Sequence, residues 1–385
     1  MAKSNPTLNL DGVKRFRNQW RDFILRKMRG RFVEPVRMLN HGYLHTFNAS
    51  FDGLFLREQG SDSLLVANHP MNFGTIQSCI RTEDKLSAKT SLLHLALFEI
   101  SGLSVLDFSR ATAEQMAEQT VKEFLIFWTD YLNFAKADLR IYFFGGGTFA
   151  EATGGRVRSG QYVAPDTFSA QIWQRHGLSS QQLIPEYSNE TFLLHIGNPL
   201  REHHSGYRND IFMERDGLHF EIGTLNFVSH QSLLRGTEII GIKPLPFRLR
   251  EIAIGQERVL AAAAGISNLY QLPYIKPLVD AALARIGDER SALTYVDALR
   301  VLHYFFSDGW TYENLRGRIY REHRHELNKF VEILFDLGHG LSRQRTIEMM
   351  ELNSELQPWH PELRQGIQNT LEQLDVYKSR RDADS

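Results

Sequence analysis

Cysteine is nearly absent from the sequence, because Cys79 is the single one among 385 residues. A disulfide framework and a cysteine zinc cluster are therefore excluded. An excess of charge of either sign is also lacking, since the formal net charge is −1, so any contact with nucleic acid has to come from a local patch. No run approaches the roughly 18 apolar residues that cross a membrane, and the first residues lack an apolar stretch of signal-peptide length. We expect a soluble, cytoplasmic protein without a membrane partner.

The short motifs that identify common enzyme classes are missing as well. There is no Gly-x-Ser-x-Gly, no His-Glu-x-x-His, no Gly-x-Gly-x-x-Gly after a strand and no Walker lysine. The run Gly145–Gly147 lacks the Lys and Ser/Thr of a phosphate-binding loop and is interpreted as a turn. His203 and His204, and the pair His323 and His325, have no third ligand nearby in sequence, so we interpret them as surface or hydrogen-bonded side chains and expect no bound metal.

What the sequence does contain is an ordinary globular composition, 42% hydrophobic and 23% charged. The order of patterns is a helix, strands interrupted by helices, more strands, and then helices alone after residue 291. This order predicts an α+β fold, with an antiparallel sheet flanked by helices and an all-helical domain after it. We expect a catalytic domain at 1–265, a helical domain at 266–377 and a disordered tail at 378–385.

Several elements are predicted by hydrophobic periodicity. In residues 12–29 a basic face lies over an apolar stripe, and we interpret that face as solvated. Helices are also expected at 112–134, 168–175 and 256–264. Strands are expected at 139–144, 218–228 and 238–245, with a polar loop at 206–217.

A series of short segments makes sense when taken together. Gln77–Arg81 is followed by Lys85, and then by Phe98–Gly102; much later come Phe220–Ile222 and Gly255–Arg258. In order and spacing these segments resemble the catalytic core of alanyl-tRNA synthetase, a class II aminoacyl-tRNA synthetase. The resemblance covers about residues 14 to 330. It implies that Gln77–Arg81 and Phe98–Gly102 are the outgoing and return strands of motif 2, and that Arg258 follows the strand-to-helix junction of motif 3.

The resemblance implies a role for each of the residues that match. Arg81 would pair with the α-phosphate of ATP and Arg258 with its γ-phosphate, since fixed guanidinium groups stabilise developing phosphate charge well. The carboxylates of Glu99 and Glu221 would hold adenine, ribose or Mg²⁺, because their apolar neighbours put them on the open face of each strand. The implied amino-acid pocket consists of Leu194, Thr224, Asn226 and Glu251, and the implied tRNA contacts are Arg300, Arg316 and Arg318.

The sequence also departs from the family. The Gly-Lys-His-Asn-Asp run after the motif 2 arginine reads Glu83–Ser87 here, and only Lys85 matches. The family's aspartate for the substrate ammonium falls at Glu251, and its Trp-Asn pair falls at Gly223 and Thr224. Changes of this size alter discrimination by about 1–3 kcal/mol each, so alanine is not assumed. We expect a truncated, stand-alone paralogue without the family's editing and C-terminal domains.

From these observations we expect ATP-dependent activation of a small amino acid, in a specialised rather than housekeeping role. The acceptor would be a tRNA, a carrier-protein thiol or a small amine, and the protein a monomer or a weak dimer. Four arginines at 316–324 suit a tRNA backbone or a solvated helix about equally well. The alternative is a catalytically inactive paralogue that binds tRNA or another protein and regulates it.

Overall fold

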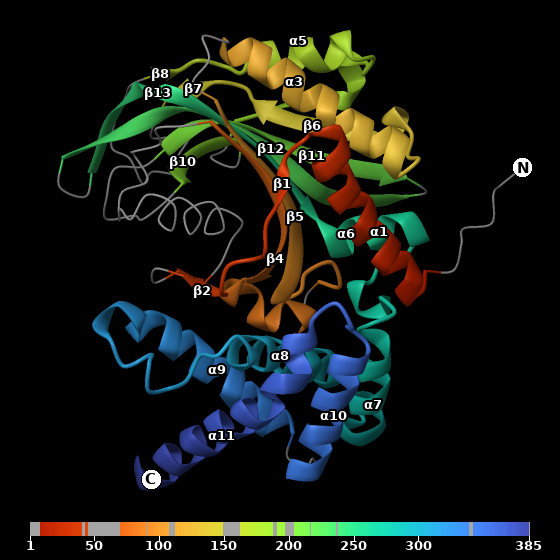
Figure 1. Cartoon of the computed structure of the whole chain (residues 1–385), viewed down its shortest axis with the longest axis vertical. Coiled ribbons are helices and arrows are strands. Elements are labelled where there is room, and N and C mark those ends of the chain that lie inside the picture. Colours follow the sequence, from red (N-terminus) through yellow and green to blue (C-terminus); the bar gives the residue numbers. More distant parts are fainter. Residues whose placement is uncertain are drawn as a thin grey trace, which may run out of the picture.

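A nine-stranded sheet forms the centre of the computed structural model (Figure 1). The spatial order of its main path is β1, β4, β5, β13, β12, β11, β6 and β9, with β10 paired to β11. The pairs β1–β4 and β6–β9 are parallel and the others are antiparallel. The structure describes residues 8–40, 43–44, 70–89, 91–107, 112–148, 162–187, 191–196, 204–215, 217–235, 238–338 and 342–384.

Long antiparallel strands dominate the sheet. Its strands are β1 (Arg31–Phe32), β4 (Met71–Ile80), β5 (Leu97–Asp107), β6 (Leu139–Phe144), β9 (Leu183–Glu186), β10 (Phe192–Ile196), β11 (His204–Arg215), β12 (Leu218–Arg235) and β13 (Glu238–Gly255). Two small ribbons accompany it, β2 (Leu39–Asn40) with β3 (Tyr43–Leu44) and β7 (Gly147–Thr148) with β8 (Tyr162–Val163).

Two N-terminal helical segments cover one face of the sheet (Figure 1). The first is α1 (Leu10–Asp22), which continues into the π-helix η1 (Phe23–Lys27). Its stripe of Phe16, Trp20 and Phe23 is buried, and the Trp20 indole donates to the Thr75 carbonyl of β4 at 3.2 Å. The second is α3 (Ala113–Ile126) with η3 (Phe127–Tyr131), which packs against β12 and β13. The predicted helices at 12–29 and 112–134 are thereby confirmed.

Helices alone make up the rest of the chain. After β13 come α6 (Gln256–Ala264), η6 (Leu269–Gln271), α7 (Lys276–Ile286), α8 (Glu289–Ser307), η7 (Arg318–Tyr320), α9 (Arg321–Leu337), α10 (Arg343–Glu355) and α11 (Pro361–Asp384). Shorter helical pieces within the first part are η2 (Thr82–Lys89), η4 (Lys136–Asp138), α5 (Thr167–Arg175) and η5 (Ser180–Gln182). The predicted α+β class, with an antiparallel sheet flanked by helices and then a helical region, is confirmed. In the described residues no helix is both long and apolar enough to cross a membrane.

Two sequence-based expectations are wrong. The polar segment 206–217 is a strand, β11, rather than a loop, because Arg208, Asn209 and Asp210 direct their polar groups into hydrogen bonds and ion pairs inside the fold. The tail from Lys378 continues α11 to Asp384 rather than being disordered. Packing explains the second difference, since the Arg380 guanidinium lies 5.2 Å from the Tyr312 ring.

The helical region and the sheet share one hydrophobic core, and buried polar contacts join them. Asp297 of α8 is fully buried, and its carboxylate accepts the Ala96 backbone N–H, just before β5, at 2.8 Å. Arg300 of the same helix donates to the Leu97 carbonyl at 3.4 Å. The structure therefore anchors strand β5 directly on helix α8.

Candidate functional site

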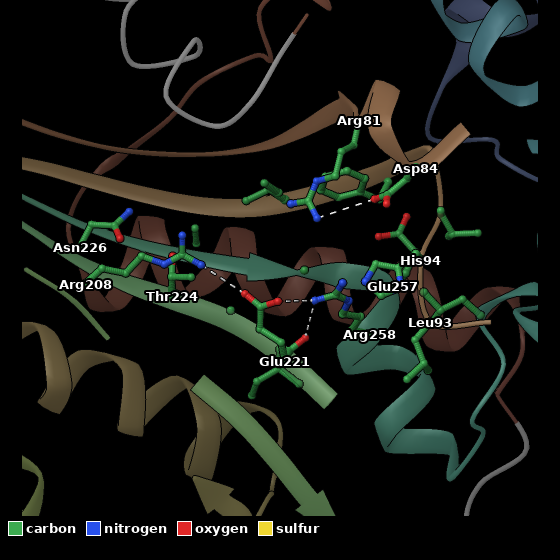
Figure 2. Close-up of a pocket in the computed structure, with 18 residues that line it drawn as sticks. Arg81, Asp84, Leu93, His94, Arg208, Glu221, Thr224, Asn226, Glu257 and Arg258 are labelled. Atoms are coloured by element: carbon green, nitrogen blue, oxygen red, sulfur yellow. Dashed lines mark hydrogen bonds and ion pairs between the residues drawn. The ribbon is translucent and has the colours of Figure 1, made fainter. Parts of the chain in front are cut away.

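A pocket of about 220 Å³ opens on the sheet face opposite α1, between β4, β5, β12, β13 and the start of α6 (Figure 2). Glycine and other small side chains expose backbone at its floor, and apolar side chains form part of its wall. Charged groups point into it from several elements. Its lining residues are Arg81, Asp84, Leu93, His94, Leu95, Phe98, Ile100, Arg208, Glu221, Ile222, Gly223, Thr224, Asn226, Ala253, Gly255, Glu257, Arg258 and Leu269.

Arg81 reaches the pocket from the end of β4. Strands β4 and β5 pair antiparallel, with Cys79 opposite Phe98, so the strand and return strand expected around Arg81 are present. The Arg81 N–H donates to the Ala96 carbonyl at 2.9 Å, which fixes the end of the hairpin. Its guanidinium lies 5.3 Å from the Phe98 ring and 3.7 Å from the Asp84 carboxylate. The side chain is 45% exposed and thus accessible to a ligand.

Arg258 reaches the same pocket from the opposite wall. It lies in the first turn of α6, directly after β13, so the expected strand-to-helix junction is also present. Its Nη1 donates to the Glu221 carboxylate at 2.8 Å and to the Glu221 carbonyl at 3.0 Å. Arg81 and Arg258, which are far apart in the sequence, therefore line one cavity.

Glu221 lies between two arginines near the centre of the pocket (Figure 2). Its Oε2 accepts from Arg258, and its Oε1 lies 3.3 Å from Nη2 of Arg208 on β11. Arg208 also pairs with Asp210. The alternation around Phe220 and Ile222 had predicted that Glu221 faces a site, and the carboxylate does line the pocket. Arg208 was missed because its strand had been interpreted as a loop.

Glu251 lies beneath the end of the pocket that Thr224 and Asn226 line. Its side chain is fully buried and accepts hydrogen bonds from Ser104 Oγ at 3.1 Å and Asn226 Nδ2 at 3.2 Å. Burial raises the pKa of Glu251 to about 7, although both hydrogen bonds oppose the shift. The Asn226 Oδ1 atom is buried without a hydrogen-bond partner in the described part of the chain. This end of the pocket therefore combines a buried carboxyl group with a free acceptor.

Glu99 does not face the pocket, so the interpretation that it lies on an open face is wrong. Its neighbours Phe98 and Ile100 line the pocket instead, while Glu99 points to the opposite side. There it pairs with Arg17 of α1 at 2.5 Å and with His360, which precedes α11, at 2.9 Å. Burial opposes its ionisation, but Arg17 and His360 hold the pKa of Glu99 well below its usual range. α1 and the helical region cover this face of β5, whereas Phe98 and Ile100 on its other face line the pocket.

Glu257 and His94 also line the pocket and were not predicted. The Glu257 carboxylate is buried and accepts the Glu99 backbone N–H at 3.0 Å and the Tyr274 hydroxyl at 3.0 Å. Burial, with the nearby Glu99 charge, raises the pKa of Glu257 to about 7. Burial and the Arg258 charge lower the pKa of His94. Adjacency to Arg258 and to the Phe98 strand was the available sequence signal for these two residues.

Three of the remaining expected residues, Arg300, Arg316 and Arg318, do not line the pocket, and the side chain of Leu194 is outside the described part of the structure. Leu194 is on β10. Arg300 is only 2% exposed, 3.7 Å from Asp297 and 6.0 Å from the Tyr274 ring, so the expectation that it contacts tRNA is wrong. Its burial in α8 follows from its role in anchoring β5. Arg316 precedes the 3-10 helix η7, which begins at Arg318, and both arginines are exposed on the helical region.

Within the described residues no cluster of three or more His, Cys, Asp or Glu has the arrangement of a metal site. The pocket nevertheless contains the carboxylates of Asp84, Glu221 and Glu257. Mg²⁺ is usually held by one or two carboxylates together with substrate phosphates. Glu221, with 32% of its side chain exposed, fits such a role, whereas Glu257 already accepts from the Glu99 backbone N–H and the Tyr274 hydroxyl.

No family model matches the chain, and no curated protein sequence matches it. Among solved structures, it is similar to a pyrrolysyl-tRNA synthetase from Desulfitobacterium hafniense, with 10% identity, a TM-score of 0.36, and coverage of 69% of this chain and 73% of that chain. It is also similar to the RNA binding domain of threonyl-tRNA synthetase from Cryptosporidium parvum Iowa II, with 14% identity and a TM-score of 0.39. This match covers 68% of this chain and 69% of that chain. A third similar structure is a putative threonyl-tRNA synthetase from Aeropyrum pernix, with 11% identity and a TM-score of 0.41. This match covers 81% of this chain and 72% of that chain.

Proposed function

We propose that this protein activates an amino acid with ATP, in the manner of a class II aminoacyl-tRNA synthetase related to the alanyl enzyme. One observation carries the proposal: Arg81 and Arg258 line the same pocket, from the end of the β4–β5 hairpin and from the β13–α6 junction. These are the two elements on which the sequence resemblance expects the phosphate-binding arginines. Two unrelated surface arginines would have no reason to meet in one cavity.

The proposed reaction joins the amino-acid carboxylate to the α-phosphorus of ATP. A carboxylate oxygen attacks the α-phosphorus, and the bond from that phosphorus to the oxygen bridging the β-phosphorus breaks. Pyrophosphate leaves with the electron pair, and the aminoacyl-adenylate remains. Negative charge grows on the α-phosphoryl oxygens during this step, and preorganised donors stabilise it most effectively. Arg81 would hold the α-phosphate and Arg258 the γ-phosphate.

Glu221 is the residue that would hold Mg²⁺ together with the nucleotide phosphates. Its carboxylate now bridges Arg208 and Arg258. Arg208 would hold one carboxylate oxygen in position, and the oxygen that now pairs with Arg258 would be available to the cation once Arg258 pairs with phosphate. Mg²⁺ would neutralise phosphate charge. The side chains of the described pocket thus fit both ATP and Mg²⁺.

The end of the pocket near Asn226 is the proposed amino-acid subsite. An α-ammonium group would donate to the unpartnered Asn226 Oδ1 and lie close to the Glu251 carboxylate, which it would keep ionised. Thr224 and the backbone at Gly223 would border the side chain. Since the Trp-Asn pair of the resembled family is replaced at these two positions, we propose a small amino acid and do not assume that it is alanine. The acceptor would be a tRNA, a carrier-protein thiol or an amine.

Amino-acid-dependent exchange of pyrophosphate into ATP tests the function. A panel of natural and non-protein amino acids, with small ones first, should include one that supports exchange. If none does and the protein binds ATP or tRNA without turnover, the inactive binding paralogue is the correct interpretation. Two ion pairs support that alternative. Arg258 pairs with Glu221 and Arg81 pairs with Asp84, so both arginines are already neutralised.

A further inference from the structure

A basic surface on the first helix is used by nothing described so far. Six exposed basic side chains project from α1, η1 and the residues just after them: Lys14, Arg15, Arg21, Arg26, Lys27 and Arg29. The same stretch contains two acidic side chains, Asp11 and Asp22. The whole chain has a net charge of −1, so this basic face is a local concentration of positive charge rather than a general property.

The folding of α1 explains why these charges gather on one side. Val13, Phe16, Trp20, Phe23 and Ile24 are buried and fix the orientation of the helix. Residues at a spacing of three to four lie on the same helical face, so Lys14, Arg21 and Leu25 form a row on the opposite side. From Lys14 to Lys27, at about 1.5 Å per residue, the basic face extends over about 20 Å.

We propose that the basic face binds the phosphate backbone of a double-helical nucleic acid. A duplex carries one negative charge per roughly 1.7 Å of its axis, so a 20 Å row of cations meets many phosphates. Exposed aromatic side chains, on which single-stranded bases stack, are absent from residues 10–31 of the described chain. Recognition is therefore of a helical backbone and not of bases.

The packing argues against a membrane as the occupant. A basic amphipathic helix binds a bilayer by burying its apolar face in it. Here that face is already inside the protein core, and Leu25, which is 42% exposed, is the one large apolar side chain left on the surface of α1 and η1. A polyanion that binds by charge alone fits this surface better than a lipid interface.

The basic face lies on the side of the sheet away from the pocket. Arg17 of α1 contacts Glu99, whereas Phe98 and Ile100 on the other face of β5 line the pocket. A nucleic acid held there leaves the pocket open, so backbone binding and amino-acid activation are separable. The proposal consequently stands whether or not the proposed enzymatic function is correct.

The test uses fluorescence anisotropy with the full chain, a labelled bulk tRNA and a labelled DNA duplex, over 50 to 200 mM salt. The variant carries Lys14→Gln, Arg15→Gln and Lys27→Gln, none of which has a described contact. The matched control carries Arg285→Gln, Arg364→Gln and Lys378→Gln, which are exposed on α7 and α11. Both variants lose the same charge.

We expect wild type and control to bind with affinity that falls steeply with salt. The variant should bind at least tenfold more weakly, and the slope of log affinity against log salt should decrease by about 2 to 3, since each phosphate contact contributes about 0.7 to 0.9. Equal affinity for tRNA and DNA supports backbone recognition. The proposal is overturned if wild type does not bind at 50 mM salt, if both triple variants behave alike, or if anionic vesicles but neither nucleic acid bind. Pyrophosphate exchange, measured in parallel, should be unchanged in the variant.

Discussion

Arg81 and Arg258 have carboxylate partners of unequal strength. Arg258 has 19% of its side chain exposed and is held by two hydrogen bonds to Glu221, whereas Arg81 is 45% exposed and 3.7 Å from Asp84. A partly exposed, weakly paired guanidinium can turn toward a phosphate without leaving a buried charge behind. Arg81 is therefore the residue whose removal should affect catalysis most and stability least.

Substitution of either arginine should abolish most activation. Arg81→Ala and Arg258→Ala should each lower the rate of pyrophosphate exchange at least 100-fold, because about 2.7 kcal/mol of charge stabilisation is lost in the transition state. Arg318→Ala is the control, since this arginine lies outside the pocket. Wild-type exchange in the Arg81 or Arg258 variant would show that the pocket is not the site of activation.

Glu251 should make stability depend on pH in a defined direction. Burial raises its pKa from 4.5 to about 7, so between these values the unfolded chain loses the proton before the folded chain does. Stability is then lost as pH rises through 7, by up to about 3 kcal/mol. Glu251→Gln removes this loss, and its unfolding free energy relative to wild type, measured in urea, should increase from pH 5 to pH 8.

The control for that measurement is Glu313→Gln, whose side chain is 83% exposed. It should show no such trend. The same Glu251→Gln protein should also have a higher KM for the amino acid, because the ammonium loses its carboxylate. A variant with unaltered pH dependence would mean that Glu251 ionises normally in the folded protein.

For single residues, the sequence identified the two arginines that line the pocket but not all of the residues around them. Arg81 and Arg258 were singled out by the resemblance of their segments to motifs 2 and 3, not by hydrophobic periodicity. Glu99 could not be predicted, because alternation tells which residues share a face and not which face is open. Arg300 was misjudged for a related reason, as charge in a sequence gives no sign of burial.

Among the elements, β12 and β13 approach each other closely at the pocket floor, and this approach favours glycine at position 223. A Cβ at Gly223 would lie 2.3 Å from the Ala253 carbonyl oxygen, which is backbone and cannot move aside. In this chain the two strands therefore occupy space that a side chain at this position would need. The floor of the pocket is consequently formed by backbone.

Gly223→Ala should therefore be costly. Overpacking of this kind costs about 1–3 kcal/mol, so we expect a lower melting temperature, together with reduced exchange because the floor shifts. Gly255→Ala in the neighbouring strand is the matched control, as its nearest contact would be an ordinary 3.8 Å. It should lose less, about 1 kcal/mol or below, since glycine is preferred to alanine at a helix N-cap. Equal melting temperatures for the two variants would contradict the expected clash.

Elements with apolar periodicity were predictable, and polar strands were not. The helices at 12–29 and 256–264 each have a buried apolar face. Strand β11 instead has Asn209 bound to both Trp173 and Asp166, with Arg208 in the pocket. These polar side chains, one in the pocket and one in a buried hydrogen-bond network, interrupt the alternation of apolar and polar residues by which strands are predicted.

For the whole molecule, the contact between Glu99 and His360 connects the sheet to the helical region. His360 is buried between the carboxylates of Glu99, at 2.9 Å, and Glu362, at 2.7 Å. Burial disfavours its charged ring, but the two carboxylates outweigh burial and raise the pKa of His360. Its charged form thus stabilises the fold fully below pH 6.5, and this contribution is lost as pH rises through the raised pKa.

His360→Gln should destabilise the protein by about 2 to 4 kcal/mol at pH 6, because a buried ion pair loses one partner. The difference from wild type should shrink towards pH 9. Thermal unfolding followed by circular dichroism at several pH values measures this, with the exposed His325→Gln as control. A difference that does not change with pH would indicate that His360 is neutral in the folded state.

The attachment of β5 to α8 has a practical consequence for dissection of the protein. A fragment that stops at residue 265 would leave the Ala96 N–H without Asp297, Glu99 without His360 and Glu257 without Tyr274. Such a fragment should be recovered in soluble form only when the piece from residue 266 onward is co-expressed with it. At the expected boundary between the catalytic and helical parts, the chain can then be cut into two pieces that stay associated. Neither piece can be removed without loss of folding. A chimera with another protein would therefore have to keep the sheet residues and the helical residues of these contacts together.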